Sequence, residues 1–312
     1  MKVSIGRQSH PSTIAIELQY DATKKRWLGI KRFDRTAGQP FVIRLLHGGE
    51  VTVYPSMLDE DERQSLWKEL TANSHYFRQY KVQGSNEPRA HFLLHKQATE
   101  QWEDKQPGYR YGVTTMKSKP LNAEQFPALN CIARWLKKIC RVPDWNIGIN
   151  PVYYRDGNDH IGFHADNDQG EEKIMSVLVQ SPPKDRKVEI WPKESKTKKR
   201  GKNGKRSISH GDKRIQLFLR AGDGYDMNGE MQKHYVHGVP KDKSQVGTEQ
   251  MNRSVIVFRH GREKQYLKDS GTLANLEPRD CTVSANFGRS IDGLEEGSLY
   301  SRQQLLDMKA HR

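Results

Sequence analysis

Cysteine is scarce in this chain, and the three that occur, Cys131, Cys140 and Cys281, are far apart. Such scattered cysteines exclude a disulfide framework and a zinc knuckle with paired ligands, and they favour a reducing compartment. No apolar run approaches the length that spans a membrane, and the first residues contain no signal-peptide core. We therefore expect an intracellular protein, nuclear or cytoplasmic, that acts as a monomer and does not enter a membrane.

Acidic residues are too few to balance the basic ones. The chain has 38 aspartates and glutamates against 52 lysines and arginines, a formal net charge of +14. This balance favours a polyanionic partner such as nucleic acid. The alternative is an ordinary soluble protein with one lysine-rich loop. The length of 312 residues suits one catalytic domain with appendages, or two small domains.

Periodicity predicts two long helices. Residues 56–73 form the first, with Ser56 as its N-cap and acidic residues 59–62 in its first turn. Residues 126–140 form the second, because their apolar side chains recur at helical spacing. Strands are expected at 12–18, 41–46, 147–154, 174–179 and 215–219.

Residues 193–206 are rich in lysine and glycine and have no apolar period, so they predict a mobile loop. Such a loop can follow a phosphate backbone or serve as a nuclear localisation signal. The alternative is a solvated loop without a partner.

His164 and Asp166 carry the strongest chemical signal, at the end of Y-R-D-G-N-D-H-I-G-F-H-A-D. Residues two apart on a strand point to the same face, so this imidazole and this carboxylate can share a metal. A third ligand must come from elsewhere, and His234 and His237 follow downstream. Two histidines and one carboxylate are the ligand set of non-haem Fe(II) oxygenases. The alternative is a pair of surface polar residues.

Arg253 and Arg259 lie on one face of a further predicted strand, together with Val255 and Val257. Arginines on an inward face are costly unless each finds an anion. A dicarboxylate such as 2-oxoglutarate would provide a forked pairing for both.

The run from about Pro88 to Arg259 resembles the AlkB family of Fe(II)/2-oxoglutarate dioxygenases. The matching pieces are Y-R-D-G-N-D-H-I-G-F-H-A-D, M-N-G-E-M-Q-K-H-Y-V-H-G-V-P and the spacing R-x-V-x-V-x-R, in the family's order. The family motif is R-x-N-x-T-x-R, so the chain departs from it at Val255 and Val257. It also has Val152 where the family usually has the asparagine that contacts the co-substrate.

The resemblance implies an α+β, mainly β fold: a double-stranded β-helix (jelly-roll) core with supporting N-terminal helices. It divides the chain into a strand-rich extension (1–55), a dioxygenase domain (56–262) and a C-terminal tail (263–312). Within the domain, residues 77–119 form a nucleotide lid and residues 193–206 a basic insertion. The end of the tail resembles the opening of SRA-type modified-DNA-binding domains, so the tail is alternatively the start of a further module.

Roles follow from the same resemblance. The implied roles are Fe(II) ligands and catalytic residues for His164, Asp166 and His237, and 2-oxoglutarate binding for Tyr154, Arg253 and Arg259. His237 is chosen over His234 because H-G-V-P matches the family pattern at that histidine. Arg253 would pair with the far carboxylate of 2-oxoglutarate, and Arg259 would neutralise the end nearer the metal. O2 is the second co-substrate.

Four residues are candidates for contact with the substrate base. Tyr109 and Tyr111 alternate on one side of a strand, and the resemblance places Tyr111 where an aromatic ring stacks on the base. Asp168 takes the place of a carboxylate that accepts a hydrogen bond from an exocyclic amino group. Arg89 would contact a phosphate. The alternatives are ordinary strand tyrosines, a surface aspartate and a solvated arginine.

The implied function is oxidative demethylation of N-alkylated bases in DNA or RNA, as in DNA alkylation repair. DNA is favoured over RNA as the partner, although no residue separates the two. One alternative is a dioxygenase of the same fold that acts on RNA modifications or on protein. The other is a non-catalytic binding module, against which the complete ligand set and both arginines argue.

Overall fold

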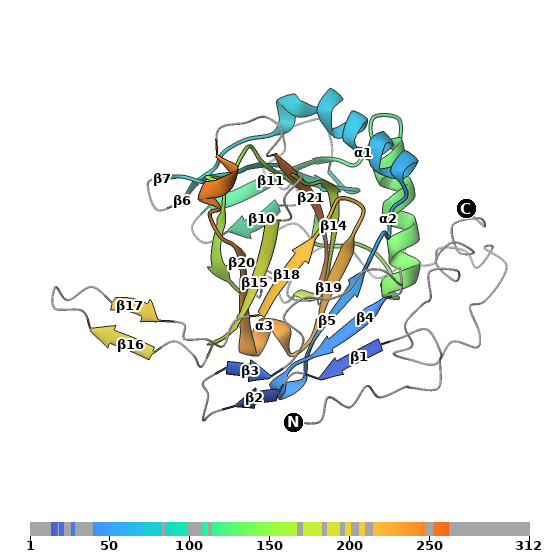
Figure 1. Cartoon of the computed structure of the whole chain (residues 1–312). Coiled ribbons are helices and arrows are strands. Elements are labelled where there is room, and N and C mark those ends of the chain that lie inside the picture. The colour runs from blue at the N-terminus through green and yellow to red at the C-terminus, as the bar shows by residue number, and fades with distance from the viewer. Residues whose placement is uncertain are drawn as a thin grey trace, which may run out of the picture.

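Two β-sheets face each other in the computed structural model of the chain, and two helices cover the outer side of the larger sheet (Figure 1). The structure describes residues 14–17, 19–21, 26–28, 40–82, 85–98, 108–111, 114–166, 171–182, 186–193, 197–200, 206–209, 215–246 and 252–261. None of the helices in these ranges is long and apolar enough to cross a membrane.

The main sheet contains, in spatial order, β1 (Ile14–Glu17), β4 (Phe41–Arg44), β5 (Gly49–Tyr54), β19 (Gly224–Gly229), β14 (Glu171–Gln180), β21 (Arg253–Gly261), β12 (Gly148–Tyr154), β9 (Leu93–His95), β11 (Thr114–Pro120) and β10 (Gly108–Tyr111). The strand β8 (Ala90–His91) pairs with β12 beside β9. The minor sheet has the order β13 (Ile161–His164), β20 (Tyr235–Val239), β15 (Arg186–Pro192) and β18 (Ile215–Leu219).

Eight strands of the two sheets wind as a double-stranded β-helix. Along the chain, β12, β14, β19 and β21 fall in the main sheet, while β13, β15, β18 and β20 fall in the minor sheet. All the pairings among these eight strands are antiparallel. The predicted mainly β, jelly-roll architecture is confirmed.

The strand β14 shows why a central strand is mostly apolar in sequence, with only the buried Ser176 interrupting the run from Ile174 to Val179. Its residues alternate between two apolar clusters: Met175, Val177 and Val179 face the helices, and Ile174 and Leu178 face the interior between the sheets. Because both faces are covered, the sequence lacks the polar positions of a half-exposed strand.

The helices α1 (Glu60–Ala72) and α2 (Pro127–Cys140) pack on the outer face of the main sheet. Both predicted helices are confirmed, but the N-cap of the first was predicted wrongly. The cap is Asp59, whose carboxylate accepts from the backbone N–H of Glu62, while the Glu62 side chain accepts from the backbone N–H of Asp59. Ser56 lies upstream in a left-handed turn with φ of 50°. The reciprocal acidic pair makes the better cap because it satisfies two free donors at once.

The N-terminal stretch contributes to the same sheet. The strand β5 pairs with β19 along its whole length, and β4 pairs with β5. The main sheet therefore runs across the predicted boundary between residues 55 and 56. The remaining short elements are β2 (Gln19–Asp21), β3 (Arg26–Leu28), β6 (Lys81–Val82), β7 (Ser85–Asn86), α3 (Met231–His234) and the 3-10 turns η1 (Leu46–Gly48), η2 (Ser74–Tyr76) and η4 (Lys243–Gln245).

The basic insertion is not wholly the mobile loop that was predicted. It contributes to an antiparallel hairpin of β16 (Thr197–Arg200) and β17 (Arg206–Ser209), which stands away from the two sheets (Figure 1). Backbone pairing between these strands does not need an apolar face, which is why the absence of an apolar period did not reveal it.

Candidate metal centre

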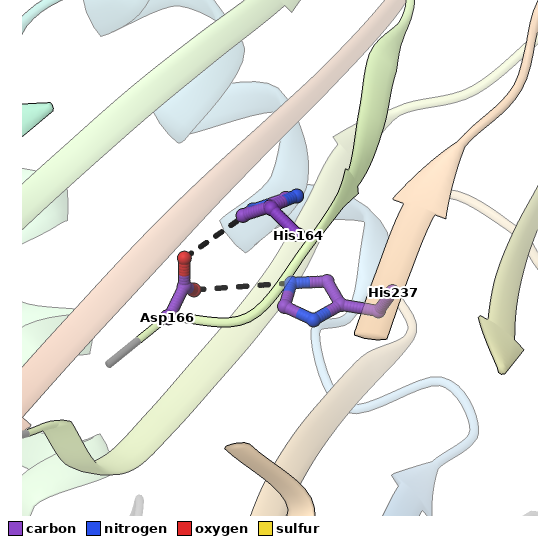
Figure 2. A group of neighbouring side chains, drawn as sticks. All are labelled: His164, Asp166 and His237. Carbon is purple, nitrogen blue, oxygen red and sulfur yellow. Dashed lines mark ion pairs between the residues drawn. The ribbon is translucent and has the colours of Figure 1, made fainter. Parts of the chain in front are cut away.

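The pairing of β13 with β20 creates the site. His164 ends β13 and lies directly opposite His237 of β20, with the centroids of the two imidazole rings 4.4 Å apart. Asp166 follows two residues later and points one carboxylate oxygen toward each ring (Figure 2). Its oxygens lie 3.3 Å from Nε2 of His164 and 3.8 Å from Nε2 of His237. One ligand atom from each residue falls within 4.8 Å of the others, so the three can hold one metal ion.

The two-residue spacing had suggested that Asp166 shares a strand face with His164, but strand alternation does not explain its position. The strand β13 ends at His164, and Asp166 lies in a bend beyond it. Its backbone N–H donates to Oε1 of Gln232, on α3, at 2.8 Å. This contact between distant segments fixes the bend, and no local pattern in the sequence indicates it.

The histidines present the nitrogens that a metal needs. Nδ1 of His164 lies 2.8 Å from the carbonyl oxygen of Gly162 and can donate its hydrogen there. The lone pair of Nε2 is then available to bind a metal. His234, the other candidate for the third ligand, stacks on His47 at a centroid distance of 4.9 Å. It does not belong to the cluster of His164, Asp166 and His237.

Charge and burial hold the side chains in their metal-binding forms. Burial lowers the pKa of His237 to about 3, with the neighbouring His164 adding to the effect. Burial alone would raise the pKa of Asp166, but the Arg259 guanidinium and the His164 imidazole outweigh it and hold that pKa well below its usual range. Near neutral pH the carboxylate is therefore ionised and His237 is neutral, so neither must lose a proton to bind a metal.

A cavity of about 670 Å³, counting its open mouth, extends from the three residues into the interior between the sheets. Both predicted arginines and both flanking tyrosines line it, namely Arg253, Arg259, Tyr154 and Tyr109.

Arg253 is the clearest sign that the cavity binds an anion. Its side chain is 1% exposed, and its Nε, Nη1 and Nη2 have no hydrogen-bond partner among the described residues. Tyr154 lies directly opposite on β12, and the guanidinium is 5.3 Å from the centre of its ring. A buried guanidinium in this state is costly, and a carboxylate in the cavity would satisfy it.

Arg259 lies at the other end of the cavity, beside the three residues. Its Nη2 is 3.5 Å from Oδ2 of Asp166, and its guanidinium is 5.0 Å from the centre of the Tyr109 ring. The two arginines therefore supply positive charge at two separate places on one wall, which suits the two carboxylates of 2-oxoglutarate.

The four residues predicted to contact the substrate base differ in where the structure places them. Tyr109 is 5% exposed and lines the cavity. Tyr111 ends β10, where its backbone pairs with Thr114, but its side chain lies outside the described residues, as does Asp168. The alternative of a solvated Arg89 is wrong. Arg89 is 4% exposed and lines the cavity, with Nη2 3.2 Å from Oε1 of Glu87.

Sequence reasoning missed two further buried polar residues at this wall, His91 and Asn150, and the buried Glu87 behind His91. Asn150 could have been found, because it lies two residues before Val152 on the same strand face. Arg186 is also fully buried. It donates to the carbonyl oxygens of Asp156 at 2.9 Å and Pro240 at 3.2 Å and lies 5.2 Å from the centre of the Tyr154 ring.

A substitution at Gly238, directly after His237, tests whether the close approach of β13 to β20 is needed for metal binding. A Cβ there would lie 2.9 Å from the carbonyl oxygen of Ile161 and 3.2 Å from that of Gly162, so β13 could not stay close to β20. Gly238→Ala should weaken Fe(II) affinity by about 10–100-fold, as loss of ligand support typically does. Gly162→Ala is the matched control, since its Cβ would meet nothing within 4 Å. Equal affinities for both variants in a competitive metal titration would contradict the assignment.

A search of curated proteins found no match to this chain. The family model described as the 2OG-Fe(II) oxygenase superfamily matches residues 50–262, more than half of the chain. The matched region contains His164, Asp166 and His237 as well as Arg253 and Arg259. The family implies Fe(II), 2-oxoglutarate and O2, and the buried Arg253 and the His-Asp-His group fit that set. The chain belongs to the 2OG-Fe(II) oxygenase superfamily and is an Fe(II)/2-oxoglutarate-dependent dioxygenase.

Proposed function

We propose that this dioxygenase belongs to the AlkB branch and oxidatively demethylates N-alkylated bases in nucleic acid, with DNA alkylation repair as its role. The observation that carries the proposal is the cavity beside the metal centre, with an aromatic side chain from β10 in its wall, in a chain of net charge +14. The motif from Tyr154 to Asp166 supports the same branch. An intracellular location, nuclear or cytoplasmic, and action as a monomer belong to this proposal.

The protein's own residues supply positioning. Fe(II), 2-oxoglutarate and O2, when bound, oxidise the carbon of an N-alkyl group, and the hydroxylated group then leaves as an aldehyde. His164, Asp166 and His237 would hold the metal. Arg253 would hold the far carboxylate of 2-oxoglutarate, and Arg259 would neutralise the end beside the metal. Both guanidiniums are at least nine-tenths buried, where charge interactions are less screened than in water.

The substrate base must leave a duplex to reach this centre. Tyr109 and Arg89 line the cavity, where Tyr109 would contact the base and Arg89 a phosphate. Tyr111 would stack on the base from the adjacent end of β10. Asp168 would accept from an exocyclic amino group. The hairpin β16–β17 lies farther out and would contact the phosphate backbone.

The substrate class is tested by succinate release. Purified protein is given Fe(II), 2-oxoglutarate and a panel of DNA and RNA oligonucleotides, with and without N-methylated bases, and Asp166→Asn serves as the inactive control. We expect succinate and formaldehyde in equal amounts, only with methylated strands. Succinate release that responds to peptides and to none of the oligonucleotides would overturn the nucleic-acid assignment.

Arg253→Met should separate co-substrate binding from folding. The variant should bind 2-oxoglutarate more weakly by about 2–5 kcal/mol, the usual loss for one member of a buried charge pair. Its unfolding temperature without ligands should not fall, because the substitution removes a buried charge that has no hydrogen-bond partner among the described residues. Arg134→Met, at an exposed position of α2, is the control for the substitution itself. Wild-type affinity in the Arg253 variant would refute the assigned role.

The hairpin β16–β17 and Tyr111 should have separable effects. Replacing residues 194–209 with a short Gly-Ser linker should weaken binding to all strands alike. It should also flatten the plot of log affinity against log salt by roughly 0.7–0.9 for each lost phosphate contact. Tyr111→Ala should instead slow turnover of methylated bases and leave the salt slope unchanged, because stacking acts on one base. An unchanged slope in the linker variant would exclude backbone contact by the hairpin.

A further inference from the structure

A continuous series of polar contacts leads from the buried Glu87 to the metal centre. Oε2 of Glu87 lies 2.5 Å from Nε2 of His91, and Nδ1 of His91 lies 3.4 Å from Nδ2 of Asn150. Oδ1 of Asn150 lies 3.5 Å from Nη1 of Arg259, whose Nη2 lies 3.5 Å from Oδ2 of Asp166. Every member is at most 8% exposed.

Donors and acceptors along this series agree in one arrangement. If Nε2 of His91 donates to Glu87, Nδ1 is left as the acceptor for one hydrogen of the Asn150 amide. The other amide hydrogen goes to the carbonyl oxygen of Phe92 at 2.5 Å, which leaves Oδ1 to accept from Arg259. Burial lowers the pKa of His91, in keeping with the neutral ring that this arrangement requires.

Both ends of the series are anchored. Arg89 reaches the second oxygen of Glu87 with Nη2 at 3.2 Å, so the carboxylate is held between a guanidinium and an imidazole. At the other end, the face of the Arg259 guanidinium lies over Tyr109. Arg259 is therefore held on three sides, by Asn150, Asp166 and Tyr109.

The neighbouring positions offer nothing equivalent. Val152 lies opposite Val255 across β12 and β21, and neither side chain has a polar atom. Asn150, which lies opposite Val257, is the only amide among the β12 residues that line the cavity. Without its carbonyl oxygen, Nη1 of Arg259 would lose its contact on this wall.

We infer that Asn150, held by His91 and Glu87, is a positioning residue that orients Arg259 toward the metal-proximal end of 2-oxoglutarate. The inference goes beyond the proposed substrate, because it concerns only co-substrate binding by the dioxygenase. It assigns this polar series to pre-organisation of one guanidinium rather than to contact with the base.

A double-mutant cycle tests it, with 2-oxoglutarate affinity measured anaerobically from the absorbance of the Fe(II)–2-oxoglutarate complex. Asn150→Ala alone should weaken affinity by about tenfold, the effect of one lost contact to a charged group. Arg259→Lys keeps the charge but cannot reach Asn150 and Asp166 together, so Asn150→Ala should add little in that background. In the Arg253→Lys background, Asn150→Ala should keep its full effect.

Two further variants separate positioning from folding. Asn146 lies outside the cavity, and its side-chain amide donates to the carbonyl oxygen of Gly261 at 3.0 Å and accepts from the backbone N–H of Gly261 at 2.9 Å. Asn146→Ala removes both hydrogen bonds. It should lower the unfolding temperature and leave 2-oxoglutarate affinity unchanged. His91→Leu should weaken affinity about threefold, in the same direction as Asn150→Ala, since it removes the support of the amide but keeps Asn150 itself. It stands in if Asn150→Ala does not fold.

The inference is overturned if folded Asn150→Ala binds 2-oxoglutarate as the wild type does, or if its effect is equal in the Arg259→Lys and Arg253→Lys backgrounds. Should Asn150→Ala not fold, wild-type affinity in His91→Leu overturns it. None of these measurements contains a nucleic acid, so they stand or fall independently of the substrate assay.

Discussion

The pairing of β13 with β20 is the constraint on which the rest of the site depends. It sets His164 opposite His237, and it needs a residue without a Cβ at position 238 because the facing carbonyl oxygens approach so closely. The carboxylate of Asp166 can then face both imidazoles because Gln232 holds the bend that carries it. A metal site of this kind is built from strand register first and from side-chain choice second.

Buried positive charge is the second feature of this interior. Arg89, Arg186, Arg253 and Arg259 are each at most 8% exposed. Arg89 pairs with Glu87, Arg186 with backbone carbonyl oxygens, and Arg259 with Asp166. Of these four, Arg253 alone has no hydrogen-bond partner among the described residues on any of its three nitrogens, so a bound anion is the partner we expect. A dicarboxylate that binds would form the ion pair that Arg253 lacks among the described residues. Because this pair can form only in the folded protein, its free energy strengthens co-substrate binding and stabilises the folded state together.

Much of this was predictable from sequence because the signals are local. The apolar run of β14, the helical spacing of α2 and the alternation of Arg253 with Val255 each report the environment of one element. The place of Asp166 and the contacts of Arg89 were not predictable, because both depend on segments far apart in the chain. His91 and Asn150 were missed for the same reason: 59 residues separate them, and only the packing of β8 against β12 brings them together.

The central claim is that one Fe(II) and one 2-oxoglutarate bind together between His164, Asp166, His237 and the two arginines. Anaerobic titration of the protein with Fe(II) and 2-oxoglutarate measures this directly, because the chelated complex absorbs visible light. The account predicts a band that saturates at one equivalent of each and is absent in Asp166→Leu. A protein that gives no band, or an Asp166→Leu variant that keeps it, would contradict the account.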